Sequence, residues 1–165
     1  MHTKAGMVDK LWLALRQAGK GFTIPADPRA EGPYGLAVVQ AKVMAAWRRV
    51  NDVAGAIYRA EANAKAKIVR MKNTRRMKAD LMSSDAHNDP GLRMVRTVPA
   101  RLKATIASRL ADEDATIAGI EADVESLSAL KQYARDVVEE AKAAKEVLRQ
   151  QVDLLAAHRL ADGSE

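Results

Sequence analysis

Apolar residues recur along this chain at the spacing of an amphipathic helix, and Gly and Pro interrupt that spacing strongly in two places. The interruptions are GKGFTIPADPRAEGPYG at 19–35 and DPGLRMVRTVP at 89–99. Because Gly and Pro end helices, we expect three helical segments. The first, 8–18, carries Leu11, Trp12 and Leu15 at helical spacing, which predicts a short amphipathic helix that docks on another surface.

The second and third segments, residues 36 to about 82 and 100 to about 160, carry apolar residues at heptad spacing. A seven-residue repeat places one apolar seam along a helix, as in a coiled coil. The seam of the second segment consists of Leu36, Val39, Val43, Ala46, Val50, Val53, Ile57, Ala60, Ala64 and Met71. In the third segment Lys131, Lys145 and Glu113 interrupt the seam. Two long helices joined by one connection predict an antiparallel helical hairpin.

The apolar face of this hairpin is wider than one partner helix can cover. Val38, Trp47, Leu130, Val137 and Val147 lie beside the seam and widen it. We therefore expect several chains to assemble into a homo-oligomer, with the number of subunits left open. The candidate contact residues are those of the third segment's seam: Leu110, Ile117, Ile120, Val124, Leu127, Val138, Leu148, Val152 and Leu155.

Composition agrees with an all-α protein. Hydrophobic residues make up 48% of the 165 residues and aromatic residues only 4%, which is typical of long helices rather than sheets. The absence of cysteine excludes disulfides and thiolate zinc sites. No apolar run is long enough to cross a bilayer, and LWLAL at 11–15 is too short for a secretory signal, so we expect a cytoplasmic protein of a bacterium or a phage-infected cell.

We expect a short helix and a Gly/Pro-rich linker at 1–35, followed by the helical hairpin at 36–160, whose charge is uneven, with a basic tip near 59–109 and an acidic C-terminal helix. Residues 59–109 contain 13 basic and 4 acidic side chains, whereas residues 110–165 contain 6 and 13. The stretch AKAKIVRMKNTRRMK, 64–78, has seven Lys or Arg and no carboxylate. A solvated helix face ordinarily mixes signs, because like charges one turn apart repel. This stretch therefore favours binding to a polyanion.

A phosphate backbone suits this pattern best, because it requires only many cations within reach. The candidate residues are Arg59, Lys65, Lys67, Arg70, Lys72, Arg75, Arg76, Lys78, Arg93, Arg96 and Arg101. An anionic membrane fits less well, since the apolar side chains among them are scattered around the helix. An inert surface and an acidic protein partner remain alternatives. Nothing in the pattern reads base sequence, so we expect backbone contacts; Trp47 and Tyr58 fit core packing better than base stacking.

Catalysis has little support in the sequence. His2, His87 and His158 are far apart, and no grouping of metal ligands or of a nucleophile with a base emerges, so we expect neither an enzyme nor a cofactor or metal. The acidic residues of the third segment instead suggest a charge contact, for example with a neighbouring subunit. They are Asp112, Glu113, Asp114, Glu121, Asp123 and Glu125.

Residues 36–155 resemble the UvsY-type recombination mediators of phages. The resemblance rests on Trp47, on Glu61 fourteen residues later, on the run YRAEANAKAKIVRMK at 58–72, and on the long C-terminal helix. It implies a small ring-forming homo-oligomer that binds single-stranded DNA through a basic helical region, helps displace the single-strand-binding protein, and loads a recombinase without hydrolysing a nucleotide. It also implies that the C-terminal helix serves subunit assembly.

A structural or scaffolding coiled-coil protein is the alternative, with the basic region contacting an acidic protein partner. The sequence leaves open whether the nucleic acid is DNA or RNA and which recombinase would be the partner.

Overall fold

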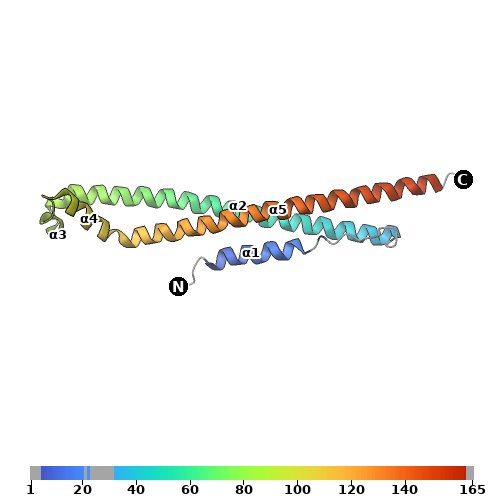
Figure 1. The fold of residues 1–165 in the computed structure, drawn as a ribbon, viewed down its shortest axis with the longest axis horizontal. Coiled ribbons are helices and arrows are strands. Elements are labelled where there is room, and N and C mark those ends of the chain that lie inside the picture. The colour runs from blue at the N-terminus through green and yellow to red at the C-terminus, as the bar shows by residue number, and fades with distance from the viewer. Residues whose placement is uncertain (1–4, 21, 23–31, 163–165) are drawn as a thin grey trace. The chain divides into compact units, whose positions relative to one another are not determined.

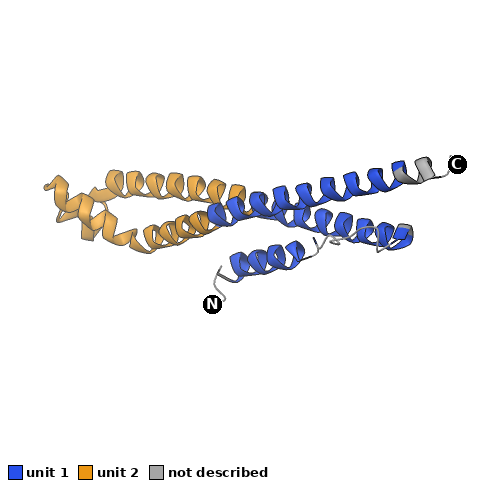
Figure 2. Cartoon of the chain, turned by 45° about the vertical axis from the view of Figure 1, so that its right-hand side comes forward, with its two compact units in different colours: residues 1–59, 127–165 blue, residues 60–126 orange. Residues whose placement is uncertain are grey.

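The computed structural model describes residues 5–20, 22 and 32–162, and every regular element in these ranges is a helix (Figure 1). The elements are α1 (Ala5–Gly19), α2 (Gly32–Ser84), the 3-10 helix η1 (Asp85–His87), α3 (Pro90–Arg93), α4 (Pro99–Arg109) and α5 (Ala111–Asp162). The expected all-α class is confirmed. The chain divides into two compact units, one of Met1–Arg59 with Leu127–Glu165 and one of Ala60–Ser126 (Figure 2). Both α2 and α5 contribute residues to each unit.

Unit 1 is built where α1 lies against α2 and α5 (Figure 1). Leu15 and Ala18, one turn apart on α1, are buried with residues of both long helices. The other buried members of this cluster are Val50, Ala54, Ile57, Leu130, Ala134 and Val137. The ring of Trp12 on α1 lies 4.8 Å from that of Tyr133 on α5, centroid to centroid. The expectation that the first helix docks on another surface therefore holds, and the surface belongs to the same chain.

The docking of α1 covers part of the wide apolar face that we expected a second chain to cover. Leu130 and Val137, expected beside the seam, are 5% and 6% exposed because α1 covers them. Their register is also shifted by one residue from the heptad expectation, which placed Lys131 and Val138 in the seam. On α2, Ala54 is buried while Val53 is only half-buried. An undistorted α-helix turns every 3.6 residues rather than every 3.5, so its inward face drifts across a strict heptad.

A second apolar cluster of unit 1 lies farther along the same two helices. Leu36, Val43 and Leu148 are buried there, with Val39, Val152 and Leu155 packed against them. The lysines that interrupt the seam have aromatic partners on α2. The ammonium of Lys131 lies 5.3 Å from the ring centre of Tyr58, and that of Lys145 lies 4.7 Å from the ring centre of Trp47. Cation–π contacts of this kind let a lysine lie at a helix interface without a buried, unpaired charge.

Unit 2 has its core around η1, α3 and α4. Ala86, Leu92, Ile106 and Leu110 are buried together. The third segment, expected as one helix, is two, because the backbone turns at Leu110, which has φ −101° and ψ 9°. Burial of Leu110 in this core fixes the turn, and the charges around it agree: Arg109 ends α4, and three acidic residues open α5, each at the favourable end of its helix dipole.

Candidate nucleic-acid interface

The basic stretch lies on the part of α2 that belongs to unit 2, and α5 neutralises three of its side chains. The ammonium of Lys72 lies 2.7 Å from a carboxylate oxygen of Glu121. The guanidinium of Arg75 donates two hydrogen bonds to Asp114, Nε to Oδ1 at 2.5 Å and Nη2 to Oδ2 at 2.8 Å. Lys78 donates to Glu113. The compensating charge that is absent from residues 64–78 therefore comes from the acidic start of α5.

Helix geometry explains why these three cations meet α5. At 3.6 residues per turn, Lys72 and Lys78 lie about 60° to either side of Arg75 on the helix. Arg75 lies on the inward face, in line with half-buried Ile68 and Ala79, so its fork reaches α5 directly. The acidic residues, expected as a contact for a neighbouring subunit, bind within the chain at Glu113, Asp114 and Glu121.

These ion pairs lie at the surface. The six side chains are 31 to 57% exposed. Hydrogen bonds from Arg75 lower the pKa of the Asp114 carboxyl, and the same bonds raise the pKa of the Arg75 guanidinium. Because exposed pairs are screened by solvent and salt, they hold α2 to α5 weakly.

A fourth predicted residue, Lys65, is paired along its own helix. Its ammonium lies 2.6 Å from Glu61, one turn earlier. Glu61 is 4% exposed and occupies an inward position of α2. The positive charge of Lys65 is therefore paired with a buried carboxylate of its own helix.

Three predicted residues of this stretch of α2 are exposed and lie off its inward face, each about 80° or more around the helix from Arg75. Lys67, Arg70 and Arg76 are exposed, and no carboxylate pairs with them among the described residues. Along the helix they span roughly 14 Å at 1.5 Å per residue. Asn73 and Thr74, also exposed, lie between them and add neutral hydrogen-bonding groups. We call Lys67, Arg70 and Arg76 the outward group; Arg70 lies between Lys67 and Arg76, which are on opposite sides of the helix.

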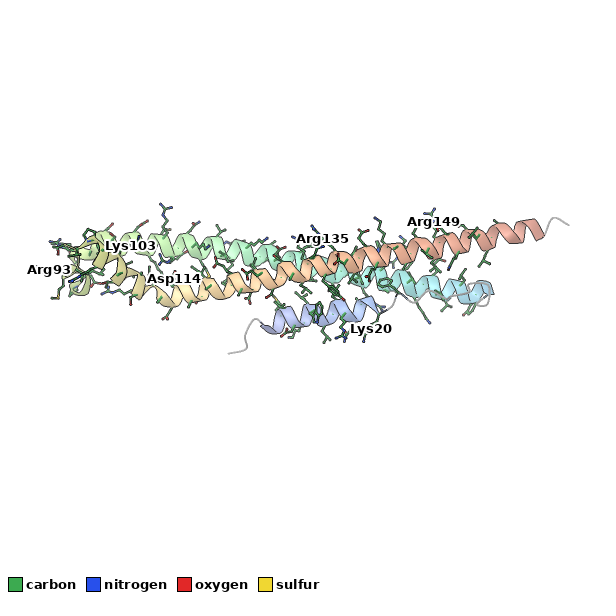
Figure 3. All side chains as sticks on the ribbon, viewed as in Figure 1. Lys20, Arg93, Lys103, Asp114, Arg135 and Arg149 are labelled. Atoms are coloured by element: carbon green, nitrogen blue, oxygen red, sulfur yellow. The ribbon has the colours of Figure 1, made fainter. Side chains whose placement is uncertain are left out.

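The other predicted cations of unit 2 surround α3 and α4, where Figure 3 labels Arg93 and Lys103. Arg93, Arg96 and Arg101 are exposed, and a guanidinium nitrogen of Arg96 lies 2.7 Å from Nδ1 of His87. Lys103 is exposed as well and was missed by the sequence analysis. Its signal was its place in RLK, two residues after Arg101 on the same short helix.

Asp89 and Arg109 join the start of α3 to the end of α4. The carboxylate of Asp89 caps α3, because its Oδ1 accepts hydrogen bonds from the backbone N–H of Gly91 at 2.8 Å and of Leu92 at 3.1 Å. Arg109 donates to the same carboxylate from Nη1 at 2.5 Å and from Nη2 at 3.2 Å. Arg109 and these backbone N–H groups together lower the pKa of Asp89 to about 2. A Cβ on Gly91 would lie 2.5 Å from Nη2 of Arg109, so any other residue there would push the end of this flexible side chain away.

The remaining predicted residues lie elsewhere. Arg59 is exposed but belongs to unit 1, as do Tyr58 and Trp47, whose rings face lysines. The seam residues expected at a subunit contact lie largely inside the chain. Leu110, Ile117, Ile120, Leu127 and Leu148 are buried, and Val124, Val138, Val152 and Leu155 are half-buried.

The described part of the chain has no group of His, Asp and Glu that could hold a metal ion. Within that part, no helix combines the length and the apolarity needed to cross a membrane. A scan against family models gives no match, and neither the curated proteins nor the solved structures include one.

Proposed function

We propose that this protein is a non-enzymatic, single-stranded-DNA-binding recombination mediator that helps load a recombinase onto the strand in the cytoplasm. One observation carries the proposal: six Lys and Arg side chains of unit 2 that the sequence predicts to bind phosphate are exposed, and no carboxylate among the described residues neutralises them. They are Lys67, Arg70, Arg76, Arg93, Arg96 and Arg101. A phosphate backbone needs several cations within reach and little else. The resemblance to UvsY-type mediators supports the same function.

We infer also that the two long helices form an antiparallel hairpin. In unit 2 each of the three interhelical ion pairs joins two residues whose numbers add to between 189 and 193. In unit 1 those of the two lysine–aromatic contacts add to 189 and 192. A nearly constant sum is what two antiparallel helices around one connection produce. This regularity supports the hairpin that the sequence predicts.

Assembly into a homo-oligomer completes the proposal. One chain offers few phosphate contacts, and several chains held together would raise the effective concentration of each basic surface along one strand. The apolar residues still exposed on α2 of unit 2 support such a contact. Val69, Met77 and Leu81 are each about 60% exposed. Sedimentation analysis of the purified chain tests this part, and a monomer at micromolar concentration would refute it.

Fluorescence anisotropy of a labelled oligothymidine at several salt concentrations tests the binding itself. The variant Lys67→Gln, Arg70→Gln, Arg76→Gln removes the outward group. Its matched control, Lys42→Gln, Arg48→Gln, Arg49→Gln, removes three exposed cations from the part of α2 in unit 1. Each lost phosphate contact lowers the slope of log K against log salt by about 0.7, so we expect the first variant to lose about 2 units and the control to keep the parent slope.

Two results would overturn the proposal. One is no binding by the parent protein at about 50 mM salt, where phosphate contacts are strong. The other is an equal loss of slope in both variants, because binding would then follow net charge and not this surface.

A scaffolding protein is the second candidate, and the exposed Val69, Met77 and Leu81 favour it, because apolar side chains among cations suit an acidic protein helix. Binding of the oligothymidine unaffected by Met77→Ser and Leu81→Ser would favour nucleic acid. Weak binding by the parent protein, together with a stoichiometric complex with an acidic helical protein from its natural host, would favour the scaffold.

A further inference from the structure

We infer that Lys72, Arg75 and Lys78 form a second phosphate-binding surface, which Glu113, Asp114 and Glu121 of α5 cover and which a nucleic-acid strand uncovers by displacing these carboxylates. The inference rests on the proposed function and extends it. It divides the basic stretch into an outward group that contacts phosphates first and an inward group that contacts them afterwards.

The geometry of the pairs is the first support. Asp114, which Figure 3 labels, lies near the start of α5 and accepts two hydrogen bonds from the Arg75 guanidinium, at 2.5 and 2.8 Å. A phosphate group accepts the same two-pronged contact from arginine. The carboxylates of Glu113 and Glu121 likewise lie at the ammonium groups of Lys78 and Lys72. All three carboxylates thus occupy positions that phosphate oxygens would take.

Weak attachment of α2 in this region is the second support. From residue 62 to residue 85, no side chain of α2 is fully buried, although Glu61 and Ala86 on either side of this stretch are. On α5, Ile117 and Ile120 are buried opposite it. The apolar contact of this stretch comes from side chains such as Ile68 and Met71 that are only half-buried, and ion pairs that remain 31 to 57% exposed add to it. Such pairs are individually weak and screened by salt, so a strand that offers many phosphates competes with them.

The charge balance of unit 2 is the third support. Its 67 residues hold twelve Lys and Arg against ten Asp and Glu, which leaves a net charge of only +2. The covered surface therefore adds little to the attraction of a polyanion until the carboxylates are displaced. Binding should then involve more phosphates than the outward group can contact alone.

Charge-matched variants of the full chain test this inference by the oligothymidine assay. The variant Glu113→Gln, Asp114→Asn, Glu121→Gln removes the cover. The control Asp80→Asn, Asp112→Asn, Glu125→Gln raises the net charge by the same three units at exposed carboxylates of unit 2 that no described cation pairs with. In the parent, each displaced carboxylate takes up a counterion that offsets the one released from the phosphate, so the inward cations add little to the slope. The first variant lacks this uptake. We therefore expect its salt slope to steepen by about 2 units, at about 0.7 for each uncovered cation, and that of the control to stay near the parent value.

A third variant identifies the source of the gain. Adding Lys72→Gln, Arg75→Gln and Lys78→Gln to the uncovered variant restores the parent's net charge and should return the slope to the parent value. Circular dichroism verifies that each variant stays helical. Equal slopes in the uncovered variant and its control would overturn this inference alone. A gain that survived the loss of the three inward cations would do the same, whereas no binding by parent or uncovered variant would overturn the proposed function as well.

Discussion

Leu15 is the most deeply buried side chain of α1, and its removal is the most direct test of how unit 1 is held together. Leu15 has no exposed surface and packs among buried residues of α2 and α5. Replacing a buried Leu by Ala removes its transfer free energy and leaves a cavity, which together cost about 3 kcal/mol. Every 1.4 kcal/mol is a factor of ten, so Leu15→Ala should raise the population of chains with α1 undocked about 100-fold.

Hydrogen exchange of the α1 amides measures this population, because these amides exchange from the undocked form. The control is Leu13→Ala, the same substitution two residues away on the same helix, where the side chain is 54% exposed. A surface change of this kind shifts stability by at most about 0.5 kcal/mol, so its exchange should rise less than about threefold. If Leu15→Ala and Leu13→Ala accelerated exchange equally, α1 would not be held by Leu15, and Leu130 and Val137 would have no cover from this chain.

Three further predictions concern unit 2. The folded pKa of Asp89 is about 2, below its ordinary 3.8, so its pairing with Arg109 stabilises the fold above about pH 4 and is lost as the pH falls through 2. The melting temperature of the parent should therefore exceed that of Asp89→Asn at pH 7, with the gap closing towards pH 2; a gap independent of pH would contradict this. Gly91→Ala should not stabilise the parent, because the new Cβ displaces the Arg109 guanidinium, but should stabilise an Arg109→Gln background by about 0.5 kcal/mol of helix propensity, as chemical denaturation can measure. Raising the salt from 0.1 to 1 M should accelerate hydrogen exchange in residues 62–82 of α2 more than in residues 43–57; equal acceleration would mean that the ion pairs contribute nothing to holding this stretch.

The helical class and the breaks between segments follow from the sequence, because Gly, Pro and apolar periodicity are local signals. The docking of α1 was anticipated only as far as Leu15 and its helical spacing. No local sequence signal indicates that α1 packs on Leu130 and Val137, because that contact depends on how three helices pack together. The burial of Ala54 in place of the expected Val53 was also not predictable locally, because the inward face of the helix drifts from a strict heptad over many residues.

The ion pairs of unit 2 could have been predicted. A hairpin whose connection is centred near residue 95 places α2 and α5 residues opposite each other when their numbers add to about 190. By that rule Lys78 faces the stretch from Asp112 to Asp114, where Glu113 lies. Residues 64–78 contain no carboxylate, but this pattern describes only neighbours along one helix. In a hairpin the nearest carboxylates come from the other helix.

The two units thus use different interactions along the same pair of long helices. Unit 1 buries Leu15, Ile57 and other apolar side chains of three helices, an interaction that salt affects little. Unit 2 has its apolar core around α3 and α4, and between that core and Glu61 its stretch of α2 combines half-buried apolar side chains with exposed charge pairs. A phosphate polyanion acts on charge pairs and not on apolar packing. If the protein binds a nucleic-acid strand, unit 2 is therefore where binding can rearrange contacts, while unit 1 keeps its fold.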